Sequence, residues 1–111
     1  MPAKIGEFEE VVLLLVAAQH DQAYGLSITR AIEETLKRSV TMSSVHTALY
    51  RLEEKGMAES RVSGATRARG GRRKRLFTIT ALGKKALVEA RDTRFQLWSM
   101  IHDMVIANGK I

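Results

Sequence analysis

A cationic segment with several glycines interrupts the apolar pattern of this chain at residues 61–75. The segment reads RVSGATRARGGRRKR and holds seven Lys or Arg side chains, three glycines and no acidic residue. The rest of the chain has eleven Lys or Arg against twelve Asp or Glu, so the formal net charge of +6 is local to this segment. Because glycine lets a backbone approach a ligand closely, a cationic loop of this kind predicts a polyanion as the partner.

The length and composition favour one small globular domain. The chain has 111 residues, 45% of them hydrophobic, which is enough for a modest core that an oligomer would help to stabilise. Because it contains no cysteine, it can form no disulfide and no zinc site built on sulfur. The longest apolar run, Val11–Ala18, is far too short to span a bilayer, and the acidic residues before it are unlike a signal peptide. We therefore expect a soluble, cytoplasmic protein without a membrane partner.

The first half of the chain contains three segments with apolar residues at helical spacing. They predict helices at about residues 5–20, 24–38 and 41–55. Thr41 is placed to cap the third helix, and Gly56 to end it in a left-handed conformation. The inner face of this helix is predicted as a stripe formed by Met42, Val45, Leu49 and Leu52. Its opposite face carries hydroxyl, imidazole and phenol groups and no acid before Glu53, which suits close approach to an anionic groove.

The apolar pattern changes after residue 56. Residues 57–63 and 76–80 are predicted strands, which the cationic segment joins into a hairpin with a long loop. A last helix, capped by Thr80, is predicted to run to about Ala107, so its second half must project from the body. That half carries an apolar heptad seam, interrupted by Arg94, which predicts pairing with the same helix of a second copy. The residues expected at this dimer interface are Leu87, Ala90, Leu97, Trp98, Ile101, Met104 and Val105.

Three helices followed by a hairpin with a basic tip form a winged helix, in which the second and third helices are the helix-turn-helix. The predicted fold class is mainly α with a small β-hairpin: a winged helix-turn-helix domain over residues 1–80 and a long C-terminal dimerisation helix over residues 81–111. The sequence resembles the PadR family of bacterial winged-helix transcription regulators, in the short form with one C-terminal helix. The resemblance rests on four segments in order: GEFEEVVLL, AYGLSI, SSVHTALYRLEEKGM and GGRRKRLFTITALGKKAL.

The resemblance implies double-stranded DNA as the partner. The third helix would enter the major groove through Ser43, Ser44, His46, Thr47, Tyr50 and Arg51. The wing, meaning the hairpin with its loop, would contact phosphates or the minor groove through Arg67, Arg69, Arg72, Arg73, Lys74 and Arg75. His46 departs from the family pattern, which usually has tyrosine there, so the contact at this position is open. A dimer of such units predicts a short inverted-repeat operator and a regulator that represses by occlusion.

Two other classes of function stay open at this point. A basic hairpin also suits an RNA-binding winged helix, and the same charge suits docking to an acidic protein partner. An RNA binder has no need of two-fold symmetry, so a dimer that prefers palindromic DNA would separate a transcription regulator from it. Insensitivity of DNA affinity to loss of the wing arginines would favour the acidic protein partner.

A small aromatic effector is the further partner that the resemblance suggests. Some relatives bind flat aromatic compounds between the last helices by stacking on a tryptophan, and here Trp98, Phe95 and Phe8 would form that site. No cofactor, metal site or enzymatic activity is expected. The three histidines lie on different predicted helices without metal-ligand spacing, and no residues have the arrangement of a catalytic triad.

Overall fold

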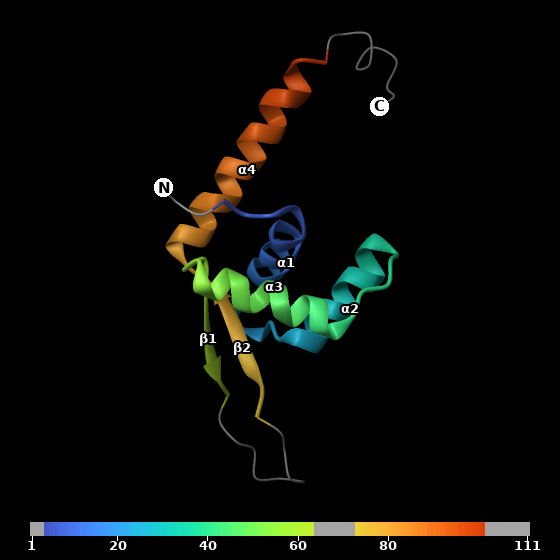
Figure 1. Ribbon diagram of the computed structural model, residues 1–111, viewed down its shortest axis with the longest axis vertical. Helices are drawn as coiled ribbons and strands as arrows, with labels where there is room; N and C mark the ends of the chain where they lie inside the picture. The colour runs from blue at the N-terminus through green and yellow to red at the C-terminus, as the bar shows by residue number, and fades with distance from the viewer. Residues whose placement is uncertain (1–3, 64–72, 102–111) are drawn as a thin grey trace.

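Four α-helices and one two-stranded antiparallel sheet make up the described part of the chain (Figure 1). The computed structural model describes residues 4–63 and 73–101. Its elements in chain order are α1 (Glu7–Ala18), the short 3-10 helix η1 (His20–Gln22), α2 (Gly25–Leu36), α3 (Met42–Glu54), β1 (Ala58–Val62), β2 (Arg75–Ile79) and α4 (Ala81–Ser99). The predicted fold class, mainly α with a small β-hairpin, is confirmed, and the arrangement is that of a winged helix.

One hydrophobic core lies where α1, α2, α3 and the hairpin meet. Its buried apolar residues are Val12, Leu13, Val16, Ala23, Ile28, Ile32, Val45, Ala48, Leu49, Leu52, Met57, Ala58 and Phe77. The predicted inner stripe of α3 is therefore right for three of its four members but wrong for Met42, which is 43% exposed. Met42 is the first residue of the helix, and helical side chains point towards the N-terminus, so this side chain extends past the end of the core.

The hairpin is joined to the helices along its second strand. β1 and β2 pair antiparallel over all five residues of each strand, with Ala58 opposite Ile79 at the base. On the other edge of β2, the N–H of Phe77 donates to the carbonyl of Ala23 over 2.8 Å, so the residue that precedes Tyr24 and α2 extends the sheet. The buried side chain of Phe77 anchors this end of the hairpin in the core.

Two predicted helix caps and one predicted helix end are confirmed. At the start of α3, Oγ1 of Thr41 accepts a hydrogen bond from the N–H of Ser44 over 3.0 Å. At the start of α4, Oγ1 of Thr80 accepts from the N–H of Gly83 over 3.0 Å and donates to the carbonyl of Gly56 over 2.6 Å. Gly56 has a φ of +77°, the left-handed conformation expected just after α3.

The first helix is shorter than predicted and ends at Ala18 instead of residue 20. His20 has a φ of +53°, which an α-helix cannot contain. The side chain of Gln19 supports the turn: its amide donates to the carbonyl of Ser27 over 3.2 Å, and its oxygen accepts from the Ser27 hydroxyl over 2.6 Å. These polar contacts redirect the chain into α2, and an apolar pattern does not reveal them.

The last helix also ends earlier than predicted, at Ser99 instead of near residue 107. The two N–H groups that follow Ser99 bond three residues back, which tightens the chain and closes the helix. Residues 91–100 are all exposed, so tertiary packing does not extend the helix. Of the predicted interface residues, Ile101 therefore lies outside the helix, and Met104 and Val105 lie outside the described residues.

The base of α4 is held against the body by a close backbone contact and an ion pair. A Cβ added to Gly83 would lie 2.1 Å from the carbonyl oxygen of Met57, so the helix and the chain before β1 touch backbone to backbone. Further along, the guanidinium of Arg94 donates to both carboxylate oxygens of Glu10 in α1, over 2.8 and 3.4 Å. The residue that interrupts the predicted apolar seam thus ties α4 to α1, and beyond it the helix projects from the body (Figure 1).

A second ion pair joins α1 to the end of α3. Glu9 is buried, and its Oε1 accepts from Nζ of Lys55 over 2.5 Å and from the N–H of Gly6 over 3.1 Å. Burial by itself would raise the pKa of Glu9, but these two hydrogen bonds, with the charges of Lys55 and Arg51, outweigh it and lower the pKa. The ionised carboxylate is therefore favoured in the folded state.

We expect Glu9 to make stability depend on pH. Because its folded pKa is lowered, its contribution is fully present above its ordinary value of 4.5 and is lost as the pH falls through the lowered folded value. The Glu9→Gln variant should be less stable than the wild type by about 1–2 kcal/mol at pH 7, and this difference should shrink below pH 4. Urea unfolding at pH 7 and at a pH below 4 measures this difference in stability. The control is Glu59→Gln, because Glu59 is exposed. An equal cost at both pH values would contradict the role of the charge.

Candidate nucleic-acid interface

α3 lies next to the start of the hairpin (Figure 1), and its outer face presents mostly polar side chains to solvent. Five of the six residues predicted on this face are exposed: Ser43, Ser44, Thr47, Tyr50 and Arg51. The Thr47 hydroxyl donates to the carbonyl of Ser43 over 2.9 Å, and the Ser44 hydroxyl donates to that of Thr41 over 2.8 Å. These side chains therefore lie close to the helix axis and leave the face open to a large ligand.

His46 lies between α2 and α3 and is only partly exposed. A Cβ added to Gly25 would lie 2.5 Å from its Nε2, so the ring fills the space that this glycine leaves at the start of α2. On its other side it stacks on Tyr50, with ring centroids 6.1 Å apart, and Tyr50 meets the edge of Phe77 at the same centroid distance. The three rings connect the start of α2 to the base of the hairpin, a link that the sequence analysis missed.

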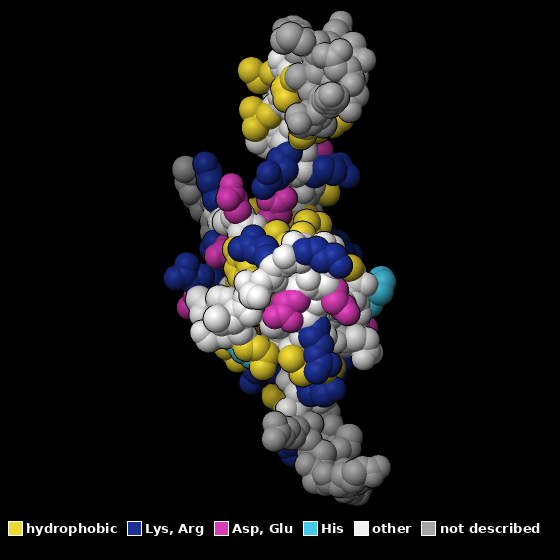
Figure 2. Space-filling model, turned by 90° about the vertical axis from the view of Figure 1, so that its right-hand side faces the viewer, with side chains coloured by type: hydrophobic (Ala, Val, Ile, Leu, Met, Phe, Trp, Pro, Cys, Tyr) yellow, Lys and Arg dark blue, Asp and Glu magenta, His cyan; other side chains and the backbone are white. Residues whose placement is uncertain are grey.

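The cations where the loop joins the second strand of the wing are exposed. Arg73, Lys74 and Arg75 lie on or next to β2, whereas Arg67, Arg69 and Arg72 lie outside the described residues. Figure 2 shows Lys and Arg side chains on the lower part of the described body. Successive residues of an extended chain point to opposite faces, and the structure accordingly gives the neighbours Lys74 and Arg75 different partners.

The ammonium of Lys74 lies 4.4 Å from the ring centroid of Tyr24, the residue that begins the turn into α2. On the other face of the strand, Nη1 of Arg75 donates to the hydroxyl of Ser60 over 3.0 Å. Ser60 in turn donates to Glu53 of α3 over 2.5 Å. Tyr24 was open in the sequence between packing and a phosphate contact, whereas Ser60 is a part of the site that charge and periodicity did not identify.

An apolar groove of about 440 Å³ lies between α1 and the projecting part of α4. Its walls are formed by Glu10, Leu14, Leu87, Val88, Arg91, Arg94, Phe95 and Trp98. Phe95 is 74% exposed and Trp98 is 41% exposed, whereas Phe8, predicted beside them, packs against the core. The apolar side chains of upper α4 are seen in Figure 2.

A second groove runs along the other side of α4. It is lined by Ile5 of the N-terminal segment and by Ala90 and Leu97, two of the predicted interface residues. Leu97 is 58% exposed, although the helix that carries it is held to α1 only one turn earlier. Both sides of α4 therefore carry uncovered apolar surface within the described chain.

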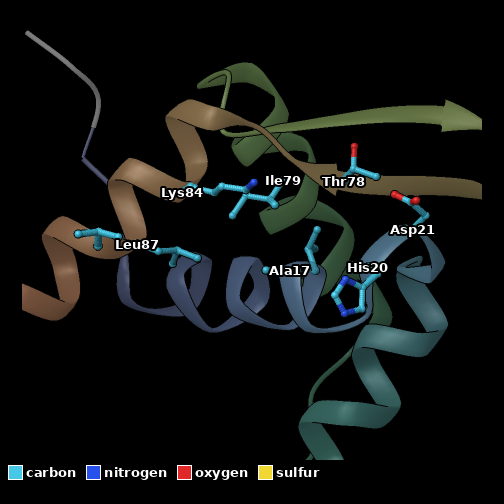
Figure 3. Close-up of a pocket in the computed structure, with 9 residues that line it drawn as sticks. Ala17, His20, Asp21, Thr78, Ile79, Lys84 and Leu87 are labelled. Atoms are coloured by element: carbon cyan, nitrogen blue, oxygen red, sulfur yellow. The ribbon is translucent and has the colours of Figure 1, made fainter.

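A further cavity of about 580 Å³ lies between the end of α1, β2 and the start of α4 (Figure 3). His20, Asp21, Thr78 and Lys84 contribute polar groups to it, beside Ala17, Ile79 and Leu87. No hydrogen bond joins these four polar side chains to one another in the described structure, so they form no acid–base pair.

Two further features of residues 4–63 and 73–101 bear on other kinds of function. No three or more His, Cys, Asp or Glu side chains in this part gather closely enough to hold a metal ion. None of the helices described is both long and apolar enough to cross a bilayer.

Comparison with known proteins identifies the relatives of this chain. A family model described as "Transcriptional regulator PadR-like family" matches residues 12–89, well over half of the chain. The chain has no match among curated proteins.

Solved structures of such regulators are similar throughout the fold. A PadR-like transcription factor from Bacteroides fragilis has a TM-score of 0.71 at 20% identity, with 84% of each chain covered. A PadR family transcription regulator from Clostridium difficile has a TM-score of 0.64 at 25% identity, over 84% of this chain and 94% of that one. Bacillus subtilis PadR in complex with operator DNA has a TM-score of 0.61 at 21% identity, over 87% of this chain and 49% of that one.

Proposed function

This chain belongs to the PadR-like family of transcriptional regulators, and we propose that it is a homodimeric repressor that binds a specific DNA sequence. The observation that carries the proposal is the polar face of α3, exposed and free of acid before Glu53, beside a hairpin whose loop holds the excess positive charge of the chain. Carboxylates would repel a phosphate backbone, whereas short hydroxyl side chains allow a helix to approach base edges. In this reading, residues 1–80 bind DNA and residues 81–111 dimerise.

The third helix would read the major groove and the wing would neutralise phosphates. The contacts that we propose for α3 are Ser43, Ser44, Thr47, Tyr50 and Arg51. His46 would reach DNA only with the edge of its ring, because Gly25 and Tyr50 cover its other sides. The wing cations that we propose at phosphates or in the minor groove are Arg67, Arg69, Arg72 and Arg73. Lys74 and Arg75, also expected there from the sequence, contact Tyr24 and Ser60 instead.

Dimerisation would cover the apolar surface of α4. The exposed side chains of Leu97, Trp98 and Phe95 support it, since a monomer would leave them in water. Two copies related by a two-fold axis would place their α3 helices in successive major grooves, about 34 Å apart. A planar aromatic effector would bind in the groove beside Trp98 and change how the paired helices pack.

Selection of bound sequences from random duplex DNA tests the function directly. The expected product is a short inverted repeat, with half-site centres about one helical turn apart. A single unrepeated site would contradict the two-fold dimer. No enrichment of duplexes, together with binding to single-stranded or structured RNA, would favour an RNA-binding winged helix instead.

We expect binding to the selected operator to depend steeply on salt. With about 6–8 phosphates neutralised per dimer, log K should fall with log salt at a slope of about −5 to −7. The double variant Arg72→Ala plus Arg73→Ala should make this slope shallower by about 4, because the dimer loses four phosphate contacts, whereas Lys85→Ala on α4 should leave it unchanged. Fluorescence titrations at four salt concentrations measure it. A wild-type slope shallower than −2, or a double variant that binds like the wild type, would count against the wing and favour docking to an acidic protein.

A further inference from the structure

A chain of hydrogen bonds crosses the hairpin from β2 to the third helix. Arg75 is two residues before Phe77 and lies on the same face of β2, and Ser60 is the residue of β1 that pairs with Phe77. The Arg75 guanidinium donates to the Ser60 hydroxyl over 3.0 Å, and this hydroxyl donates to Oε2 of Glu53 over 2.5 Å. A cation of the wing is thus connected through one hydroxyl to a carboxylate of α3.

The outer half of the hairpin needs such a connection to keep its direction. Two paired strands are marginally stable by themselves, and Phe77 is the outermost residue of β2 that is buried in the core. Beyond it, towards the loop, two polar side chains link the strand and the residue before it to the body: Arg75 contacts α3 by way of Ser60, and Lys74 contacts Tyr24 on the opposite face. The two cations hold the strand from its two sides.

The same connection accounts for an acid at the edge of the proposed DNA face. Glu53 is partly buried on α3, where an unpartnered carboxylate would repel a phosphate backbone. In the structure its Oε2 accepts a hydrogen bond from the Ser60 hydroxyl, which in turn accepts one from the charged guanidinium of Arg75. If Arg75 moved to a phosphate, Ser60 would lose a donor and Glu53 would lose its compensating charge.

We propose that Arg75 is a positioning residue that sets the angle between the wing and the third helix, acting through Ser60 and Glu53, and that it is not a phosphate contact. This inference rests on the proposed function, because the angle matters only if helix and wing bind one duplex together. It separates the cations of the wing into those that hold the strand and those that reach the DNA.

The salt dependence of operator binding distinguishes the two roles of a cation. Arg75→Ala should lower the affinity about tenfold for a dimer with two wings, because each wing loses a side-chain hydrogen bond. Its log K against log salt should keep the wild-type slope, since no phosphate contact is lost. Arg73→Ala is the matched control, because it removes an exposed arginine only two residues away. It should make the slope shallower by about 2 for the dimer. Thermal unfolding of both variants shows whether either change affects the fold.

Variants of Ser60 test whether Arg75 acts through this hydroxyl. Ser60→Ala carries no change of charge, yet it should lower operator affinity about as much as Arg75→Ala, and Ser60→Thr should restore binding. The double variant Ser60→Ala plus Arg75→Ala should bind the operator no more weakly than Arg75→Ala alone.

Two results would overturn the positioning role without touching the proposed function: a slope that becomes shallower by about 2 in Arg75→Ala, or effects of Ser60→Ala and Arg75→Ala that simply multiply. A wild-type protein that selects no operator would instead refute the function itself, and the positioning role with it.

Discussion

Replacing Leu97 by aspartate is expected to make the protein monomeric and to lower its affinity for an inverted-repeat operator by a hundredfold or more. Leu97 lies on the projecting part of α4 with 58% of its surface exposed, so the substitution leaves the core of each protomer intact. In a dimer the new carboxylate would be buried in apolar surroundings, which costs several kcal/mol. A monomer binds a single half-site and loses the gain of about 10²–10⁴ that comes from linking two binding units.

Sedimentation at micromolar concentration and titration of the operator at fixed salt measure the two effects. Gln96→Asp is the matched control, because it adds the same charge one residue away, at an exposed position that lines neither groove beside α4. A Leu97→Asp protein that sediments as a dimer would refute the proposed interface. A monomer that binds the operator as tightly as the wild type would refute the two-fold mode of binding.

Replacing Gly83 by alanine is expected to cost about 3 kcal/mol or more of folding free energy. Alanine normally stabilises a helix by about 1 kcal/mol relative to glycine. Here the added Cβ would lie 2.1 Å from the carbonyl oxygen of Met57 and 2.8 Å from Cγ1 of Ile79, so α4 must move away from the hairpin. Because the first obstacle is backbone, it cannot turn aside as a side chain does, and the overlap outweighs the gain in helix propensity.

Thermal and urea unfolding measure this loss, which should lower the melting temperature by roughly 10–20 °C. Gly25→Ala is the control: its Cβ would meet the imidazole of His46, a side chain that can rotate away, so its cost should be clearly smaller. If Gly83→Ala melts at the wild-type temperature, the close contact between α4 and the chain before β1 is wrong.

Most of the fold follows from features that are local in sequence. Thr41 and Thr80 cap their helices because a hydroxyl stands just before an apolar periodic segment, and Gly56 ends α3 because it tolerates a positive φ. The change from helical to alternating period after Gly56 identifies the hairpin. Where the prediction was wrong, at the ends of α1 and α4, the outcome depends on contacts between distant residues or on their absence, as at Gln19 and beyond Ser99.

The candidate site was less predictable than the fold because charge does not show how each cation is used. Arg75 and Lys74 are adjacent and chemically similar, yet the structure gives one a hydroxyl and the other an aromatic ring. Arg94 looked like a defect in an apolar seam and is instead the partner of Glu10, 84 positions away. The polar surface of α3 was recognised from residue types, whereas the partial burial of His46 depends on a glycine in another helix.

Thr80 is the sole residue between β2 and α4. Its hydroxyl donates to the carbonyl of Gly56, and Gly83 in the first turn of α4 lies against the backbone of Met57. The connection between strand and helix is therefore held at two points. A strand and a helix that are joined in this way, without a flexible linker, move together as one rigid unit. In the proposed dimer, a change in the crossing angle of the two α4 helices would therefore also move the wings. If residues 81–111 dimerise and residues 1–80 bind DNA, as we propose, this direct connection alone would couple the two parts.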